Sequence, residues 1–431
     1  MRYATLDDWL LWQESLHPRA IELGLERSRA VAARMGWATP GFVVITVAGT
    51  NGKGSTVAFL EAILEASGYR TGAYTSPHLL RYNERVRLRG EAVGDPALCQ
   101  AFERVDRARG DVSLTYFEFG TLAAMDIFRH ADLDVALLEV GLGGRLDAVN
   151  LFDPDVAIVT TVDIDHTDWL GSDRQAIGRE KAGIFRPGRP AVYGDPDPPA
   201  SVLEVARSLG VELQVAGRDY QCVAGEGRWD WRRDERSVEG LPSPRLPGAF
   251  QIRNAAAALT ALDALSGRLP ITRAALERGL LEATLPGRLQ ILPGPVERIL
   301  DVSHNPQAVG ELARFLRERP CPGRTHALVA MLEDKDIDGV VRAVAPVVDR
   351  WHIAGLAVPR GAPAEALAGS LARAGLDRGV TRYAGVEQAY RTLLATVAAP
   401  DRIVVFGSFH TVASVLRVES SGPTLETLGH G

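Results

Sequence analysis

The chain has 431 residues, of which 46% are hydrophobic and 24% are charged, a composition typical of a globular protein large enough for two or three domains. Its formal net charge of −6 argues against a general nucleic-acid binder, which would carry a basic field, and favours a small-molecule partner. No segment offers about 18 uninterrupted apolar residues and the N-terminus lacks the apolar core of a signal peptide, so we expect a cytoplasmic protein without a membrane partner.

A glycine-rich turn follows the first strongly apolar run. Residues 42–47 are apolar and β-branched, as in a buried strand, and residues 56–67 form a helical pattern that Gly68 is placed to end. The intervening residues 47–56 read VAGTNGKGST. Glycines let backbone N–H groups close on an anion, a helix N-terminus adds partial positive charge, and Lys53 adds a full charge. The turn therefore predicts a phosphate-binding loop, with Ser55 placed to reach a magnesium ion.

The spacing of this loop differs from the general phosphate-loop pattern G-x-x-x-x-G-K-[ST]. Only two residues separate Gly49 from Gly52, and Gly54 stands between Lys53 and Ser55. Taken alone, the stretch is also compatible with a flexible turn between a strand and a helix that binds no ligand.

Apolar strand-like runs alternate with helical patterns from residue 42 onward, which indicates an α/β fold with a parallel sheet covered on both faces. Each run is followed by a loop rich in Gly, Ser, Asp or His, and ligands bind at such carboxyl ends. The strands predicted in this first block are residues 42–47, 71–74, 134–140 and 155–160.

Two of these strands end in residues that suit metal chemistry. Glu139 lies at the tip of the strand at 134–140, where an isolated acid could equally be a solvated strand end, but beside a phosphate loop it favours a magnesium ligand. His166 follows the strand at 155–160; a lone histidine is more often structural, but this one reaches the same sheet edge. Lys181 precedes an apolar turn rather than lying on an evident exposed helix face.

Residues 186–250 change character, because prolines punctuate short segments there and Trp229 and Trp231 suggest a small, peripheral β excursion. Helical patterns return at residues 254–266 and 272–282, and by its position alone Asn254 would cap the first of these helices. Residues 285–288, LPGR, are interpreted as an interdomain hinge. The three cysteines, Cys99, Cys222 and Cys321, are far apart and indicate neither a disulfide framework nor a zinc site.

A second alternation follows the hinge and predicts a separate α/β domain of typical size. Its strands are expected at residues 296–301, 325–331, 350–354, 380–383 and 402–406, with helices such as 307–319 between them. We therefore predict a P-loop-type, parallel-sheet ATPase domain at residues 1–285 and a Rossmann-like α/β domain at residues 286–431.

The motifs, taken in order, resemble those of the folylpolyglutamate synthase/dihydrofolate synthase family, a branch of the Mur ligase superfamily of ATP-dependent amide-bond ligases. They cover nearly the whole chain, and together they are far more specific than the glycine loop alone. The matching blocks are residues 48–55, 76–79, 81–86, 139–147, 165–171, 179–185, 285–288, 301–306 and 407–411.

The resemblance implies roles for individual residues. Two Mg²⁺ ions are implied, the first served by Ser55 and Ser76, the second by Glu139, His166 and a CO₂-derived carbamate on Lys181. Catalysis is implied for Lys53, Glu139, His166, Lys181 and Arg288. The implied ATP contacts are Asn51, Gly52, Lys53, Gly54, Asn254, Arg288, Asp301 and His304.

A pterin-binding region is also implied, and its aromatic residues suit a flat heterocycle with a donor and acceptor edge. Its implied residues are Glu22, Leu23, Gly24, Thr115, Tyr116, Phe117, Glu118, Leu146, Asp147 and Ala148. Composition alone would place Tyr116, Phe117 and Phe119 in the core, and this alternative stays open at this point.

The activity implied is ATP-dependent ligation of L-glutamate to dihydropteroate and to reduced folates through an acyl phosphate, by an enzyme expected to be a monomer. Residues 113–120 look more like those of bifunctional members than of members that act on folates only. The alternatives are a monofunctional folylpolyglutamate synthase, a cell-wall Mur ligase with a different substrate, and a P-loop switch or motor, which the loop spacing disfavours.

Overall fold

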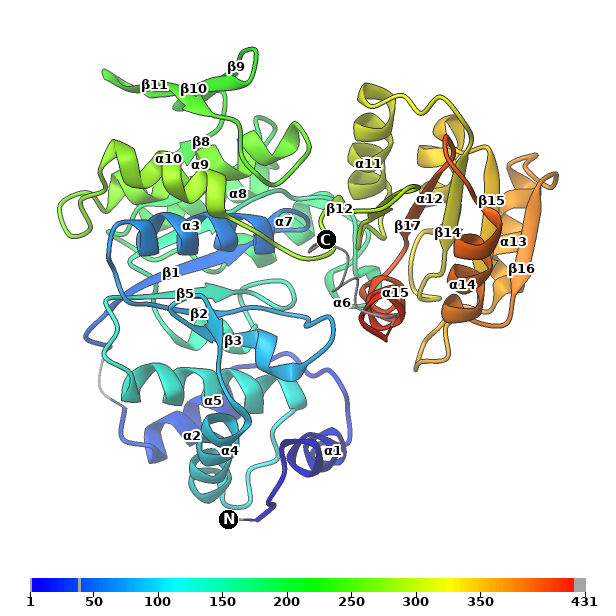
Figure 1. Ribbon diagram of the computed structural model, residues 1–431. Helices are drawn as coiled ribbons and strands as arrows, with labels where there is room; N and C mark the ends of the chain where they lie inside the picture. Colours follow the sequence, from blue (N-terminus) through cyan, green and yellow to red (C-terminus); the bar gives the residue numbers. More distant parts are fainter. Residues whose placement is uncertain (1, 38–39, 422–431) are drawn as a thin grey trace, which may run out of the picture. The chain divides into compact units, whose positions relative to one another are not determined.

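The computed structural model describes residues 2–37 and 40–421, which form two compact units (Figure 1). The first unit contains the chain up to Leu246 and Phe250–Leu285, and the second contains Pro247–Ala249 and the chain from Pro286 onward. Within the described residues, none of the helices combines the length and the apolar character that crossing a membrane would require.

The first unit is built on an eight-stranded sheet among the residues described. Its strands are β1 (Val43–Ala48), β2 (Thr71–Tyr74), β3 (Val86–Leu88), β4 (Glu91–Ala92), β5 (Val135–Glu139), β6 (Val156–Val159), β7 (Ala191–Tyr193) and β8 (Leu213–Val215). They lie in the order β4-β3-β2-β5-β1-β6-β7-β8, and all neighbours are parallel except β2 with β3 and β3 with β4. The predicted parallel sheet is confirmed, and its four predicted strands agree with the observed bounds to within one residue.

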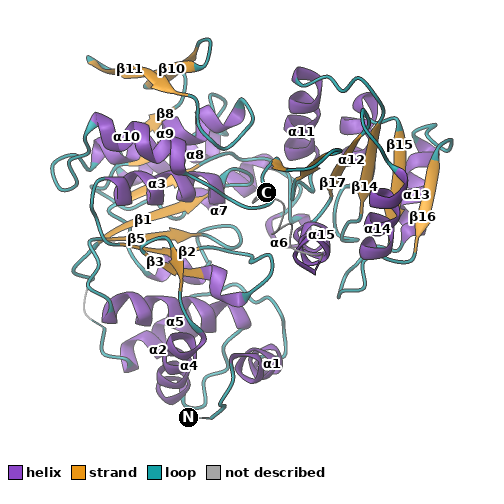
Figure 2. Cartoon of the chain, in the orientation of Figure 1, coloured by secondary structure: helices purple, strands orange, loops and turns teal. Residues whose placement is uncertain are grey.

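Helices cover both faces of this sheet (Figures 1 and 2). Val43, Ile45 and Val47 of β1 belong to one hydrophobic core, whereas Val44 and Ala48 belong to the other, because successive side chains of a strand point to opposite faces. The core that contains Val43 includes residues of α3 (Lys53–Ala66), α9 (Phe250–Ala264) and α10 (Arg273–Glu282). The core that contains Val44 includes residues of α1 (Leu6–Leu16), α2 (Glu26–Arg34), α4 (Asp95–Arg109), α5 (Tyr116–His130), α7 (Arg174–Ala182) and α8 (Ala200–Leu209). Burial on both faces explains why the strands are continuously apolar.

Helix α3 begins at Lys53, three residues before the predicted start, because the glycine loop runs directly into it. Gly52 caps the helix in a left-handed conformation with φ of 86°. At the other end Gly68 has φ of 85°, and its N–H donates to the carbonyl oxygen of Glu65, as expected for a terminating glycine.

The prediction that residues 186–250 are peripheral is wrong for β7 and β8, which extend the main sheet. The small β excursion itself is present as an antiparallel sheet of β9 (Tyr220–Ala224), β10 (Arg228–Arg233) and β11 (Arg236–Pro242). Trp229 and Trp231 are buried, and Nε1 of Trp231 donates to Oγ1 of Thr260 on α9 over 3.0 Å. The excursion therefore packs on the domain rather than projecting from it.

The second unit contains a six-stranded sheet in the part of the chain that the structure describes. Its strands are β12 (Gln290–Leu292), β13 (Glu297–Leu300), β14 (Thr325–Val329), β15 (Arg350–Ala354), β16 (Val380–Tyr383) and β17 (Arg402–Phe406), in the order β12-β13-β17-β14-β15-β16. Only β12 is antiparallel to its neighbour. The helices are α11 (Pro306–Glu318), α12 (Ile337–Val344), α13 (Ala364–Arg373), α14 (Val386–Thr396) and α15 (Phe409–Ser421), so the predicted second α/β fold is confirmed.

The short helical segments of the first unit are η1 (Tyr82–Arg85), η2 (Ala148–Leu151) and α6 (Thr167–Leu170), and the second unit has η3 (Ala345–Val347). The three cysteines are free thiols, as the sequence suggests; Cys99 is buried and Cys222 and Cys321 are half-buried.

Candidate active site

Three adjacent parallel strands bring the candidate residues of the first unit to one edge of its sheet. β1 lies between β5 and β6, with Val47 opposite Glu139 and Ala48 opposite Val159. The glycine loop follows β1, Glu139 ends β5, and the segment containing His166 follows β6. This edge is the position at which open α/β sheets bind ligands.

Two glycines of the loop have no room for a side chain. A Cβ on Gly49 would lie 1.8 Å from Oγ1 of Thr160, and a Cβ on Gly52 would lie 2.5 Å from Oδ1 of Asn254. Both glycines also have positive φ, 149° and 86°, which other residues rarely adopt. The loop is thus packed closely against the segments after β6 and within α9.

The segment after β6 holds the loop through backbone and hydroxyl groups. The N–H of Thr50 donates to the carbonyl oxygen of Thr161 over 2.8 Å, and the N–H of Asn51 donates to Oγ1 of Thr161 over 3.1 Å. The hydroxyl of Thr160 donates to the carbonyl oxygen of Asn51 over 2.5 Å. Sequence reasoning missed these two threonines, and their only signal is a pair of hydroxyl residues at the end of a predicted strand.

Lys53 and Ser55 lie in the first turn of α3. The ammonium of Lys53 donates to the carbonyl oxygens of Gly49 and Thr50 over 3.0 and 3.2 Å, so it bridges the loop. Ser55 is buried, and its hydroxyl accepts from Nε2 of Gln251 over 3.3 Å. Gly52 and Gly54 flank Lys53 at the helix N-terminus, where N–H groups and the helix dipole favour an anion.

The expectation that Asn254 caps a helix is wrong. α9 begins four residues earlier, at Phe250, so Asn254 lies within its helical backbone, and its side-chain amide donates to Oε1 of Gln251 over 3.0 Å. The buried side chain instead lies against Gly52 of the loop. The helix begins at Phe250 directly after a bend at Gly248, which has φ of 103°.

Glu139 offers a buried carboxylate at the end of β5, with 5% of its surface exposed. Its Oε2 accepts from the backbone N–H of Ser76 over 3.2 Å. Within residues 2–37 and 40–421 no group of three or more His, Cys, Asp or Glu side chains forms a ready metal cluster. A donor set of one carboxylate with the hydroxyls of Ser55 and Ser76 fits Mg²⁺, a hard ion that usually completes its coordination with nucleotide phosphates and water.

Lys181 lies on α7 with only 5% of its surface exposed. Burial, together with the positive charge of Lys53, lowers the pKa of Lys181 to about 7, and Asp165 and Asp147 act in the opposite direction. A Cβ on Gly144 would lie 3.0 Å from Cα of Lys181, so the loop after β5 packs directly on this helix.

His166 adopts a left-handed backbone conformation with φ of 54° at the start of α6. Its N–H donates to Oδ1 of Asp165 over 2.8 Å. Left-handed backbone is uncommon outside glycine, and where it occurs it often marks a constrained functional position.

Asp147 organises the loop that follows Glu139. Its carboxylate accepts from the N–H groups of Leu142 and Val149 over 2.8 and 2.9 Å. Burial raises the pKa of Asp147 to about 6, against the lowering effect of these N–H groups and of Lys53. The carbonyl oxygen of the preceding Leu146 accepts from the N–H of Gly24 over 3.2 Å, which joins two of the predicted pterin-binding segments.

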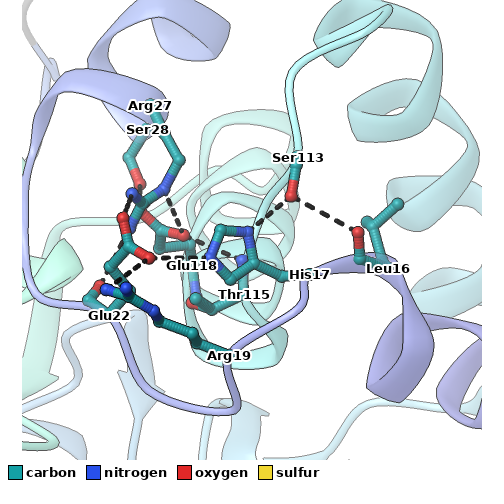
Figure 3. Close-up of polar contacts among 9 residues, drawn as sticks. All are labelled: Leu16, His17, Arg19, Glu22, Arg27, Ser28, Ser113, Thr115 and Glu118. Atoms are coloured by element: carbon teal, nitrogen blue, oxygen red, sulfur yellow. Dashed lines mark hydrogen bonds and ion pairs between the residues drawn. The ribbon is translucent and has the colours of Figure 1, made fainter.

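The third predicted segment, Thr115 to Glu118, starts α5 as a capping box. The hydroxyl of Thr115 accepts from the N–H of Glu118 over 3.2 Å, and the carboxylate of Glu118 accepts from the N–H of Thr115 over 2.8 Å. Figure 3 shows that Glu118 and Glu22 both face Arg27, which sequence reasoning did not select.

The aromatic residues of this segment divide between the core and half-buried positions. Phe119 is fully buried, as the core alternative expects, whereas Tyr116 and Phe117 are half-buried. The ring of Phe117 packs against Gly141, where a Cβ would lie 2.6 Å from it, and its centroid lies 5.9 Å from that of Tyr74.

The remaining predicted ATP contacts belong to the second unit. Cζ of Arg288 lies 5.1 Å from the ring centroid of Phe409, and the ring of His304 lies 6.5 Å from the same ring. The buried carboxylate of Asp301 accepts from the N–H groups of Leu289 and Ser303 over 2.8 and 2.9 Å. Arg288 and His304 therefore share Phe409 as a neighbour, and Asp301 braces the turn that carries Arg288.

Comparison with known proteins agrees with this architecture. Residues 47–262 match the Mur ligase middle domain, and residues 287–409 match the Mur ligase glutamate ligase domain. The chain is 47% identical over 413 residues to the dihydrofolate synthase/folylpolyglutamate synthase of Escherichia coli K12, covering 96% of this chain and 95% of the relative.

Solved structures give the same result at the level of the fold. E. coli FolC in complex with DHPP and ADP superposes with a TM-score of 0.92 at 46% identity, covering 97% of this chain and 98% of the other. A bifunctional folylpolyglutamate synthase/dihydrofolate synthase with Mn, AMPPNP and L-glutamate bound gives a TM-score of 0.90 at 46% identity and the same coverage. The chain belongs to the Mur ligase family, in the group of dihydrofolate synthase/folylpolyglutamate synthases.

Proposed function

We propose that the protein is an ATP-dependent ligase that joins L-glutamate to dihydropteroate, giving dihydrofolate, and to reduced folates, giving polyglutamates. The observation that carries the proposal is the phosphate loop with Lys53, next to Glu139 on the adjacent strand, in a chain of this family. Its relatives are named for both activities, and their structures hold a nucleotide, a divalent metal, DHPP or L-glutamate.

The reaction needs an activated carboxylate, because a carboxylate is a poor electrophile in water. An oxygen of the substrate carboxylate attacks the γ-phosphorus of ATP. The bond between the γ-phosphorus and the oxygen that bridges it to the β-phosphate breaks. ADP departs, and the substrate becomes an acyl phosphate. The neutral amino group of glutamate then attacks the acyl carbon. Phosphate leaves with the electrons of its C–O bond, and the nitrogen loses a proton to give the amide.

The first unit supplies most of the groups for this chemistry. Lys53 and the N–H groups of Gly52 to Gly54 would neutralise the phosphate charge that develops in the transfer, and Asn51 and Asn254 hold the loop beside them. The further predicted ATP contacts, Arg288, Asp301 and His304, belong to the second unit. Ser55, Ser76 and Glu139 would hold a first Mg²⁺ and Glu139, His166 and Lys181 a second, and bound magnesium neutralises charge on the transferring phosphate.

A carbamate on Lys181 is part of this proposal. Burial disfavours the ammonium form of this side chain, and a neutral amine can add to CO₂ with loss of one proton. The product carries a negative charge and two hard oxygen ligands. A carbamate would therefore attract a magnesium ion, whereas an unmodified lysine ammonium at this position would repel it.

The pterin of the acceptor would lie among the three segments joined in the first unit: Glu22 to Gly24, Thr115 to Glu118, and Leu146 to Ala148. The half-buried ring of Phe117 offers a flat apolar wall, and Asp147 and the backbone around it offer polar groups for the pterin edge. We further propose a monomer that acts in the cytoplasm, where its ATP is supplied.

The assay that tests the function measures ADP release with L-glutamate and each of three acceptors: dihydropteroate, tetrahydrofolate and a UDP-muramoyl substrate. We expect release with the first two only, and dependence on glutamate in both cases. Release with the UDP-muramoyl acceptor alone would assign a cell-wall ligase, and release without any acceptor would assign a P-loop switch or motor. Release with tetrahydrofolate alone would leave a monofunctional folylpolyglutamate synthase.

A further inference from the structure

Arg27 joins two segments of the first unit that are far apart in sequence. Its Nη1 donates to Oε1 of Glu22 over 2.5 Å and its Nη2 to the carbonyl oxygen of Glu22 over 2.9 Å. Its Nε lies 3.2 Å from each carboxylate oxygen of Glu118. The guanidinium thus binds a loop with one side and the start of α5 with the other (Figure 3).

The surroundings of this contact make it rigid. Glu118 is 3% exposed and is tied to the N–H of Thr115 and to the hydroxyl of Ser28. On the loop side, Nε2 of His17 donates to Oε2 of Glu22 over 3.1 Å. Both carboxylates are therefore already oriented when Arg27 binds them, and charge-assisted pairs of this kind are strong and directional.

The loop that Arg27 holds continues into Gly24, whose N–H donates to the carbonyl oxygen of Leu146. One arginine therefore fixes the first of the three pterin segments to the second, and the next hydrogen bond along the loop fixes it to the third. The side-chain oxygens of Glu22 are engaged by Arg27 and His17, so this side chain holds the loop in place.

We propose that Arg27 is a positioning residue for the acceptor, which sets the spacing between the Glu22 to Gly24 loop and the N-terminus of α5 through its bridge to both carboxylates. The inference rests on the proposed function, because it assigns these segments to the pterin. The bridge needs a planar fork with donors on two sides, so lysine cannot replace it.

The test compares Arg27→Lys with a double variant, Arg27→Met with Glu118→Gln, which removes the half-buried positive charge and the buried negative charge together and keeps a capping-box residue at position 118. Arg29→Gln, on an exposed position of the same helix, is the matched control. Steady-state kinetics are measured with dihydropteroate, ATP and L-glutamate, and thermal melting is measured for every variant.

We expect both Arg27 variants to raise KM for dihydropteroate by about tenfold or more, with kcat and KM for ATP changed less than about threefold. Arg29→Gln should behave as wild type. An unchanged dihydropteroate KM in Arg27→Lys and in the double variant would overturn the assignment. Equal increases in the KM for dihydropteroate and the KM for ATP would also overturn it, because they would indicate a general disturbance of the fold. If the wild-type enzyme does not turn over dihydropteroate, the proposed function and this role are refuted together. If the wild-type enzyme turns it over and the Arg27 variants have the same kinetics as wild type, the role alone is refuted.

Discussion

The backbone N–H of Ser76 donates a hydrogen bond to Oε2 of Glu139 over 3.2 Å, so the segment after β2 is tied to the end of β5. This contact brings a serine hydroxyl and a buried carboxylate to the same sheet edge as the glycine loop. A carboxylate held by an N–H group is fixed in orientation and keeps further lone pairs for a cation.

Glu139→Gln should therefore weaken magnesium binding while leaving the hydrogen bond to Ser76 possible. We expect the Mg²⁺ concentration for half-maximal activity to rise by about tenfold or more, with partial recovery of the rate in excess Mg²⁺. Titration of activity with Mg²⁺ measures the effect, and Glu91→Gln on the exposed strand β4 is the control. A magnesium dependence identical to that of wild type would remove Glu139 from the metal site.

Lys53→Ala should abolish ligation without unfolding the protein. The side chain bridges two loop carbonyls and belongs to neither hydrophobic core, so its loss removes phosphate binding rather than packing. We expect kcat/KM to fall by about a thousandfold or more, with a melting temperature changed by no more than about 2 °C. Wild-type turnover by the purified variant would contradict the phosphate-loop assignment.

Lys181→Ala should be inactive, and small carboxylates such as acetate should restore part of the activity by replacing the carbamate oxygens. A second readout does not depend on turnover: protein equilibrated with ¹³C-labelled CO₂ should show one carbamate carbon resonance in wild type and none in the variant. An unmodified lysine amine in the active, magnesium-loaded enzyme would show that the carbamate is not required.

Gly141→Ala and Phe117→Ala should alter acceptor choice in the same direction. The added methyl group would lie 2.6 Å from the ring of Phe117, so the ring must move. We expect both variants to impair dihydropteroate use more than extension of tetrahydrofolate, because the shorter acceptor depends on deeper seating of its pterin. Gly310→Ala, where nothing lies within 4 Å, is the matched control. Equal losses with both acceptors would argue against a role of this wall in acceptor choice.

His352 should make the second unit less stable as the pH falls. Its Nδ1 lies 3.1 Å from the hydroxyl of Tyr383 and its Nε2 lies 3.1 Å from Nδ1 of His326, which in turn contacts Asp401. Burial, with smaller effects of the charges of His326 and Arg350, lowers the pKa of His352 to about 4.

The sign follows from proton binding. In the unfolded chain His352 binds a proton as the pH falls below its ordinary pKa of about 6.5, whereas in the folded protein it stays neutral until about pH 4. The free energy of unfolding therefore decreases as the pH falls from about 6.5 to about 4. In His352→Gln the melting temperature should fall less between pH 7 and pH 4.5 than in wild type, by about 2–4 °C. Parallel melting curves for the two proteins across this range would contradict the assignment.

The parts of the fold that the sequence predicts well are those with a local signal. The strands around Val47 and Glu139 were predictable because an apolar run bounded by turn residues is visible within a few positions, and Gly68 marks a helix end by itself. The prediction for Asn254 was wrong because its chemistry fits a cap, whereas α9 begins at Phe250, directly after the turn at Gly248 and Ala249.

The contacts that assemble the site are not local, and for that reason they could not be read from the chain. Arg27 meets Glu118 across 91 residues, and Thr161 meets Asn51 across 110 residues. Neither pair has a periodicity or spacing that links its members. Packing of α2 against α5 brings the first pair together, and the pairing of β1 with β6 brings the second together, so residue types at strand ends can be predicted while their partners cannot.

The central claim is that one site serves both acceptors, and the most direct measurement combines product identification with competition. Purified enzyme is given ATP, Mg²⁺ and L-glutamate with dihydropteroate, with tetrahydrofolate, and with both, and the glutamylated products are quantified by mass spectrometry. We predict both products, each acceptor inhibiting use of the other competitively with an inhibition constant equal to its own KM. A preparation that extends tetrahydrofolate but forms no dihydrofolate from dihydropteroate would contradict the account.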